Sequence, residues 1–205
     1  PAPPTFKVGR RSSAPTQTVK FTVLDATPGT VLAVTVDGVT ASYTCDADDN
    51  IAGAVTGLTA ELTALAGVTA TAASPAITVA ADTAGELHTF TGISDGLAVE
   101  DITAESGIAA DLAAVKAEDS DWYALLLDSY SKPQILAAAG WAEANGIIFQ
   151  PQTADSGCFD PGVADDVMSA VKAANYARTG VWYHHEIGTG FAAGPSSAPF
   201  AAGSA

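Results

Sequence analysis

Two patterns of apolar and polar residues divide the chain near residue 105. Before this point, β-branched residues alternate with polar ones in TVKFTVL and TVLAVTVDGVTASYTC, where Asp37-Gly38 separates two alternating runs. An Asp-Gly pair in this position is typical of a β-hairpin with a type I′ turn. The short runs VTATAA, AITVAA, LHTFTGI and LAVEDIT, separated by Pro, Gly and Asp, predict further strands.

One helix is predicted among these strands. Apolar residues recur there at alternating steps of four and three, at Ile51, Val55, Leu58, Leu62 and Leu65. This spacing places them on one face of a helix, and the acids before it and Gly67 after it are typical of helix ends. We expect the helix to cover one face of the hairpin sheet. Residues 19–104 are therefore predicted to form a small β-rich α+β domain.

From about Ser106 onward, helical and strand-like segments alternate. The predicted helices are GIAADLAAVKAED, KPQILAAAGWAEAN and DPGVADDVMSAVKAAN, and the predicted strands are WYALLLD, GIIFQPQ and TGVWYHH. This alternation indicates parallel pairing with right-handed crossovers. Pro133 and Pro161 fall at first-turn helix positions, where a missing N–H costs nothing. Residues 105–187 are therefore predicted to form an α/β core of the βαβαβ type with parallel strands, and the β-rich domain precedes it or is inserted in it.

The two ends of the chain differ from both regions in composition. Residues 1–18 are rich in Pro and Ser and predict a basic, extended arm or linker. Residues 188–205, GTGFAAGPSSAPFAAGSA, are small and uncharged and predict a flexible linker or tail. The chain begins with Pro rather than Met and opens in mid-pattern, so we expect it to be a portion of a longer protein.

Charge is distributed unevenly along the 205 residues, whose formal net charge is −15. Lys7, Arg10, Arg11 and Lys20 give residues 1–20 a charge of +4, and the remainder carries four bases against 23 acids, a net of −19. Such an acidic body repels nucleic acid and anionic membranes. Opposite charges suit head-to-tail contact between copies, with Lys7, Arg10 and Arg11 as candidate subunit-interface residues. A solvated acidic surface with a loose terminus accounts for the same distribution.

The stretch VWYHHEIGTG contains the strongest candidates for chemistry. Side chains alternate along a strand, so His184 and His185 are expected to point to opposite faces of the sheet. His184 and Glu186 can share a face, but two ligands are too few for a zinc site. Because ligands usually bind at the carboxyl ends of strands in open α/β sheets, a metal or acid/base role stays as the alternative to strand-end packing.

The remaining motifs predict no cofactor and no catalytic residue. GTGFAAG resembles a Gly-rich phosphate loop, but Pro and Ser follow it where a helix should begin. Cys45 and Cys158 have neither CxxC nor Cys/His spacing. The acidic clusters DADDN and ADD lie at predicted helix starts, where carboxylates cap N–H groups. No apolar run approaches the ~20 residues that cross a bilayer, so direct membrane insertion is not expected.

Read together, DWYALLLDSYSKPQILAAAGWAEANGIIFQPQT and VKAANYARTGVWYHH resemble the sheath protein of bacteriophage contractile tails. The matching features are Asp121-Trp122-Tyr123 opening a strand, the helix 135–145 with its Trp-Ala-Glu, and Tyr176-Ala177-Arg178-Thr179 before a strand that ends in Tyr-His. The arm FKVGRRSSAPTQTVKFTV resembles the segment by which such sheaths lead into an inserted β-rich domain, and GIAADLAAVKAEDSDWY resembles the return. The resemblance covers most of residues 6–185.

The resemblance implies a structural polymer and not an enzyme. Sheath subunits stack in rings around a rigid tail tube and contract to drive the tube through the host envelope for genome ejection. The implied partners are further copies of the chain and the tail tube, baseplate and tail terminator proteins. The implied location is the virion tail, after assembly in the host cytoplasm, and no cofactor is implied.

The sequence departs from the sheath pattern in one respect. Sheath proteins are generally longer, and their terminal arms exchange strands with neighbouring subunits, whereas this chain ends in a Gly/Ala/Pro tail. The alternative from another class is a small α/β enzyme or nucleotide-binding domain with an accessory β domain. A secreted acidic adhesion module is disfavoured, because PAPPTFKVGRR lacks the apolar segment of a signal peptide.

Overall fold

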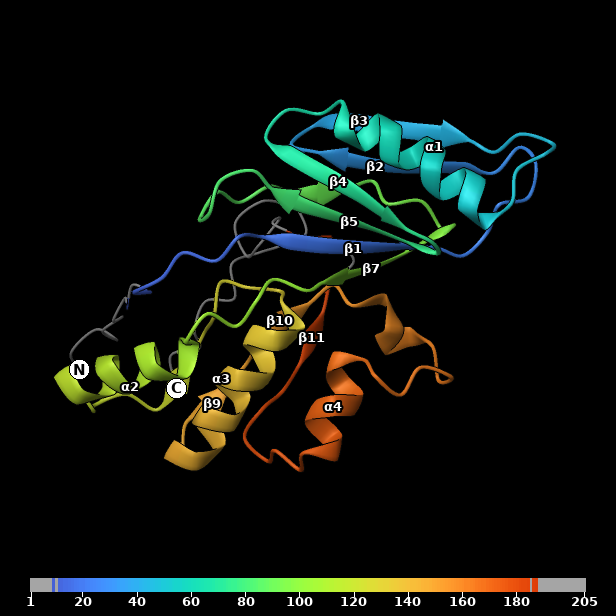
Figure 1. Ribbon diagram of the computed structural model, residues 1–205. Coiled ribbons are helices and arrows are strands. Elements are labelled where there is room, and N and C mark those ends of the chain that lie inside the picture. Colours follow the sequence, from blue (N-terminus) through green and yellow to red (C-terminus); the bar gives the residue numbers. More distant parts are fainter. Residues whose placement is uncertain (1–8, 10, 185, 188–205) are drawn as a thin grey trace.

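Two buried hydrophobic clusters organise the protein, which is a mixed α+β fold (Figure 1). The computed structural model describes residues 9, 11–184 and 186–187. The first cluster lies in a β-rich unit, residues 18–101, and the second in a helical unit, residues 108–183. Three residues of the C-terminal half, Tyr130, Ala154 and Ile187, belong to the first cluster.

The β-rich unit contains two antiparallel sheets, in the orders β4-β5-β1-β7 and β3-β2-β6. The strands are β1 (Thr18–Val23), β2 (Val31–Val36), β3 (Val39–Thr44), β4 (Val68–Ala73), β5 (Ala76–Ala81), β6 (Phe90–Thr91) and β7 (Leu97–Asp101). Every second residue of β1, β2, β5 and β7 is buried, as expected for strands with one face in a core. The two sheets share that core, where the rings of Phe21 and Phe90 lie 5.8 Å apart.

The predicted hairpin turn is confirmed. Asp37 and Gly38 both have positive φ, 48° and 84°, and Val36 pairs directly with Val39. Two central residues with positive φ define the type I′ turn that suits the twist of a hairpin.

The predicted helix is also confirmed, as α1 (Ile51–Thr63). Its buried face is formed by Ala54, Val55, Leu58 and Leu62. The cap is Asn50, whose side chain accepts hydrogen bonds from two backbone N–H groups of the first turn. The preceding Asp49 instead accepts a hydrogen bond from the Tyr43 hydroxyl at 2.7 Å.

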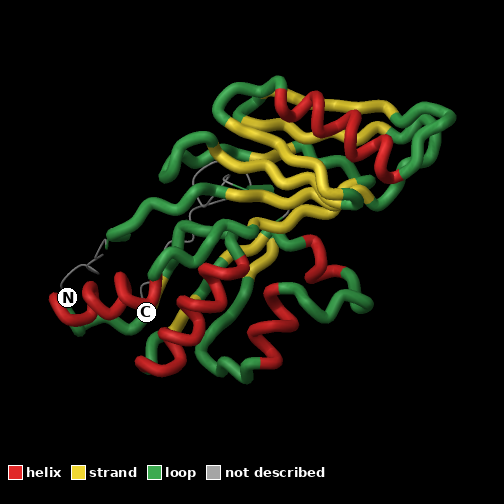
Figure 2. Tube along the Cα trace, in the orientation of Figure 1, coloured by secondary structure: helices red, strands yellow, loops and turns green. Residues whose placement is uncertain are grey.

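Helix α1 lies against both sheets, and not against the hairpin sheet alone, since it contacts β4 as well as β3 (Figure 2). The approach to β3 depends on Gly57. A Cβ at this position would lie 2.3 Å from the Tyr43 ring, so a larger residue could not be accommodated there without displacing the ring. The helix therefore closes the side of the core between the two sheets.

The helical unit contains short parallel strand pairs. Its helices are α2 (Ile108–Glu118), α3 (Lys132–Asn145), the 3-10 helix η1 (Ser156–Phe159) and α4 (Val167–Ala173). Its strands are β8 (Ala124–Leu125), β9 (Ile148–Phe149), β10 (Gln152–Thr153) and β11 (Trp182–Tyr183). β8 pairs with β9, β10 pairs with β11, and an isolated parallel bridge joins Phe149 to Thr179. These pairs are much shorter than the strands that the sequence predicted.

Two local features explain where the sequence prediction differs from the structure. Pro151 lacks an N–H and lies between β9 and β10, which divides one predicted strand into two. The prediction that Pro161 opens a helix is wrong, because Asp160 and Pro161 lie in a turn and α4 begins only after its cap, Asp166. Pro133 does lie in the first turn of α3, behind the cap Ser131.

The chain passes between the two units along adjacent segments. The arm before β1 and the return segment after β7, residues 102–107, lie side by side: the backbone N of Ile102 donates to Thr18 O at 2.8 Å, and Thr18 N donates to the Thr103 hydroxyl at 2.9 Å. Farther along, Ile187 forms a bridge to Phe90 and is buried. The β-rich unit is thus inserted between the arm and α2.

Candidate interaction site at the basic arm

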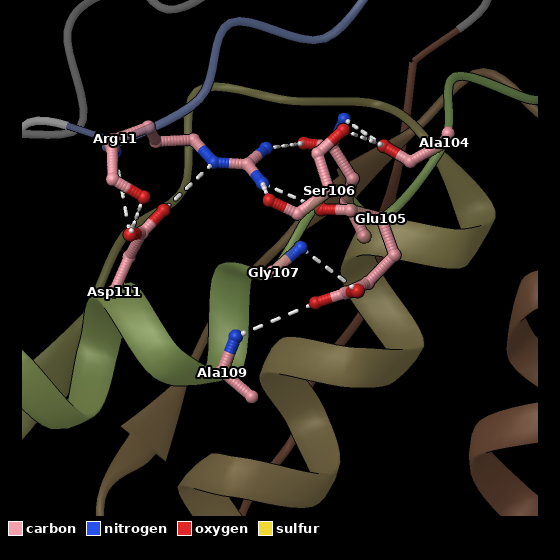
Figure 3. A network of polar contacts seen from close by, with 9 residues as sticks. Arg11, Ala104, Glu105, Ser106, Gly107, Ala109 and Asp111 are labelled. Carbon is pink, nitrogen blue, oxygen red and sulfur yellow. Dashed lines mark hydrogen bonds and ion pairs between the residues drawn. The ribbon is translucent and has the colours of Figure 1, made fainter.

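Arg11 contacts its own chain through most of its guanidinium group (Figure 3). Nη2 donates to the backbone oxygens of Glu105 at 2.5 Å and Ser106 at 3.0 Å, and Nη1 donates to Gln134 Oε1 at 3.0 Å. Nε lies 3.5 Å from Asp111 Oδ2. The other two candidate interface residues, Lys7 and Arg10, lie outside the described residues.

The partners of Arg11 lie far from it in the sequence and come from the return segment and from helices α2 and α3. Asp111 lies in the first turn of α2 and also accepts from the Ser12 hydroxyl at 2.6 Å. Gln134 lies in the first turn of α3, and its amide donates to Ala104 O at 3.0 Å. Arg11 therefore joins the arm to the return segment and to the starts of two helices. We call this set of contacts the Arg11 network.

Helix α2 begins inside the Arg11 network. Its cap is Gly107, which has a left-handed φ of 81° and no side chain to accept the first N–H groups. Glu105 supplies that acceptor: its carboxylate accepts from the backbone N of Gly107 at 3.0 Å and of Ala109 at 3.4 Å. A carboxylate at a helix start is also favoured by the helix dipole.

Hydrogen bonds keep both carboxylates of the Arg11 network ionised. The hydrogen bond from the Ser12 hydroxyl lowers the pKa of Asp111, and Arg11 lowers it further. Desolvation raises this pKa by a smaller amount than the Ser12 hydroxyl lowers it. The Gly107 N–H lowers the pKa of Glu105 in the same sense. The Arg11 network is therefore fully charged near neutral pH, and it weakens when acid protonates these groups.

The candidate residues at the end of β11 make backbone contacts. His184 Nδ1 lies 3.2 Å from the backbone O of Glu186 and 3.3 Å from its backbone N. His185 lies outside the described residues. Within residues 9, 11–184 and 186–187, no group of three or more His, Cys, Asp or Glu side chains is placed to hold a metal ion.

The carboxyl end of β10, where an α/β sheet usually binds its ligand, leads directly into a capping residue. Asp155 is buried and accepts from the backbone N of Gly157 at 2.9 Å and of Val167 at 3.0 Å. Asp166 caps α4 by accepting from Ser169 N at 2.9 Å, as the sequence predicted for the ADD cluster. Burial raises the pKa of the Cys158 thiol to about 11, which keeps it protonated and weakly nucleophilic.

Sequence reasoning missed the polar contacts between the two units. The Ser156 hydroxyl contacts both the N and the O of Val99 in β7, at 3.0 and 3.3 Å. Lys132 Nζ lies 3.7 Å from Glu100 Oε1 and 2.7 Å from Asp165 Oδ1, and Lys20 pairs with the same Glu100. Only the pairing of β1 with β7 could have predicted Lys20 opposite Glu100, because the residues are far apart in sequence.

The third histidine, His88, is a buried structural residue of the β-rich unit. Its Nδ1 lies 2.6 Å from Asp37 Oδ2, and its backbone N donates to the Gln17 side chain at 2.6 Å. Desolvation raises the pKa of Asp37, but the hydrogen bonds from Thr89 and His88 outweigh it and lower the pKa overall. This contact ties the tip of the hairpin to the segment before β6.

Comparison with known proteins gives no family for the chain. No family model matches it, and no curated protein is similar to it. Within the described part of the chain, no helix is both long enough and apolar enough to cross a membrane.

Proposed function

We propose that the chain is a structural subunit of a phage contractile tail sheath, which polymerises around the tail tube and contracts to drive the tube through the host envelope. The observation that carries the proposal is the insertion of the β-rich unit. The arm and the return segment lie side by side and are joined by the Arg11 network. This is the arrangement that the sequence resemblance implies for the arm and the return of an inserted domain.

The helical unit is proposed to be the α/β core of that subunit. The parallel pairs β8–β9 and β10–β11 and the bridge from Phe149 to Thr179 support a three-row parallel arrangement. Helix α3 packs against β9, and the buried Phe149 belongs to the same cluster as the inner faces of α2, α3 and α4. A βαβαβ core with much shortened strands accounts for these contacts.

Three features favour a structural role over catalysis. The carboxylates of Asp155 and Asp166 accept backbone N–H groups, the thiol of Cys158 is held protonated, and the His184 ring contacts backbone. The proposed partners are further copies of the chain, the tail tube, the baseplate and the tail terminator. The proposed location is the virion tail, after assembly in the host cytoplasm.

Negative-stain electron microscopy of the chain at rising concentration tests this function. We expect rings, stacked rings or tubes, with sedimentation velocity showing a matching shift to large species. A monodisperse globule that binds a nucleotide or a metal ion in equilibrium dialysis would contradict the proposal. That result would instead favour the small α/β enzyme or nucleotide-binding domain.

A further inference from the structure

Most Lys and Arg side chains of the described residues already form ion pairs or hydrogen bonds within the chain. Arg11 pairs with Asp111, Lys20 pairs with Glu100, and Lys132 pairs with Asp165. Lys116 donates to the Asn145 side chain at 3.0 Å and lies over the Trp141 ring. Across residues 11–184, the cations that form no ion pair and no close side-chain hydrogen bond are Lys172 and Arg178.

Lys172 lies in the last turn of α4 and Arg178 on the segment that joins α4 to β11, and both are exposed. The Arg178 guanidinium has one marginal contact, 3.5 Å from Nη1 to Gly146 O, and the nearby Glu143 carboxylate accepts from the backbone N of Arg178 at 3.0 Å. Beside Arg178 the surface is hollowed. The hollow is lined by Ile148, Gln150, Ala177, Arg178, Thr179 and Gly180. We call Lys172, Arg178 and this hollow the basic edge.

The β-rich unit carries the opposite charge. Residues 21–104 contain eleven acids and no Lys or Arg. Several of these acids are engaged locally: Asp25 with Thr27, Asp37 with His88, Asp49 with Tyr43 and Asp82 with Thr69. Asp46 and Asp48 are exposed in the turn between β3 and α1, and neither side chain forms a hydrogen bond or an ion pair with the described residues. We call this pair the acidic turn.

The acidic turn and the basic edge lie at opposite ends of the molecule. Figure 1 shows the β3–α1 connection at the far end of the β-rich unit, while the α4–β11 connection lies at the opposite end of the helical unit. Complementary patches at opposite ends cannot meet within one chain. Between copies they make a heterologous contact, which propagates unless rotation closes it into a ring.

We infer that the basic edge binds the acidic turn of a second copy of this chain. The inference rests on the proposed sheath function and deepens it by naming a contact between neighbouring subunits. Arg178 and Lys172 attract the carboxylates of Asp46 and Asp48, and the hollow beside Arg178 admits the turn. Charge contacts of this exposed kind set the partner and the association rate more than the total affinity.

The test compares assembly of the full chain with two variants that change net charge equally. Lys172→Gln with Arg178→Gln removes two positive charges from the basic edge. Ala113→Glu with Ala117→Glu, at exposed positions of α2, adds two negative charges elsewhere and is the control. We expect the first variant to raise the concentration for half-maximal light scattering about 2- to 10-fold at ~0.05 M salt. The difference should shrink towards none near ~1 M salt, where the screening length is ~3 Å. The control should change little.

A charge exchange identifies the partner surface. Lys172→Asp with Arg178→Asp, and separately Asp46→Lys with Asp48→Lys, should each weaken assembly, and combining all four changes in one chain should restore it. Additive weakening in the combined variant would overturn the inference. If the parent assembles and the neutralised variant matches it at every salt concentration, only this inference fails. If the parent never assembles, the sheath function fails with it.

Discussion

The two units of this protein differ in how their cores are built. The β-rich unit has paired strands of five or six residues, apart from β6, around large side chains such as Phe21, Phe90 and Leu32. The helical unit has strands of two residues, and the inner face of α3 is formed mainly by Ala138, Ala139 and Ala142. Because stabilisation by burial scales with apolar area, small side chains contribute less per residue. We therefore expect the helical unit to be the less stable of the two.

This difference bears on assembly. The exposed cations of the basic edge lie on the helical unit, so the surface proposed to bind a neighbour is carried by the weaker core. The helical unit is supported by the β-rich unit through Ser156 and Val99, through Lys132 and Glu100, and through the buried Ile187. The more stable unit thus positions the less stable one.

The largest expected effect comes from Phe21→Ala, which should lower the free energy of unfolding by about 3–5 kcal/mol. Phe21 has no exposed surface and contacts Phe90, the residue to which Ile187 is paired. All three tryptophans, Trp122, Trp141 and Trp182, belong to the helical unit, so their fluorescence reports that unit during denaturant unfolding. The unfolding transitions followed by fluorescence and by far-ultraviolet circular dichroism should both move to lower denaturant, because the helical unit loses the support of the β-rich unit.

The matched variant Phe149→Ala empties a buried site in the helical unit instead. It should shift the fluorescence transition to lower denaturant and leave the protection of the β1 and β5 amides against hydrogen exchange in place, since the β-rich core is untouched. Loss of that protection together with the fluorescence shift would mean that the two units unfold as one and that the comparison is wrong.

Arg11→Gln should lower the free energy of unfolding by a smaller amount, about 1–2 kcal/mol. The reason is that charged hydrogen bonds to two backbone oxygens and one amide oxygen are lost. Arg11→Lys should recover little of this loss, since an ammonium cannot reproduce the fork of a guanidinium. Arg178→Gln is the control for stability alone, because Arg178 makes a single marginal contact within the chain. A change in assembly rate without a change in stability would support the original prediction that Arg11 contacts another subunit.

Removal of a buried charge should give the smallest effect. Asp101 is 5% exposed, and burial raises its pKa. A carboxyl group whose folded pKa is raised favours the folded state at pH below its unfolded value, and this benefit is lost as pH rises through the folded pKa. Asp101→Asn keeps the oxygen that accepts from Thr103 N and should therefore stabilise the protein slightly at pH 7 but not near pH 3. A loss of stability at pH 7 would contradict this account.

Features encoded by neighbouring residues could be predicted from the sequence. Asp37-Gly38 identified the hairpin, the apolar spacing identified α1, and Pro133 marked the first turn of α3. Features that depend on distant partners could not be predicted. The composition of the arm indicated that Arg11 was available to another subunit, but its hydrogen-bond partners lie 94 to 123 positions away in the chain. The parallel strands are shorter than expected because the length of a strand depends on its pairing with distant segments, and because Pro151 interrupts one of them.

Amide hydrogen exchange tests the central claim most directly, namely that one chain holds two units of unequal stability which divide between Asp101 and Ile108. We predict that the amides of the central strands β1 and β5 exchange only through global unfolding. The amides of Ile148 and Phe149, bonded to Tyr123 O and Arg178 O, should exchange faster, through opening of the helical unit alone. Equal protection on both sides of residues 102–107 would contradict the claim.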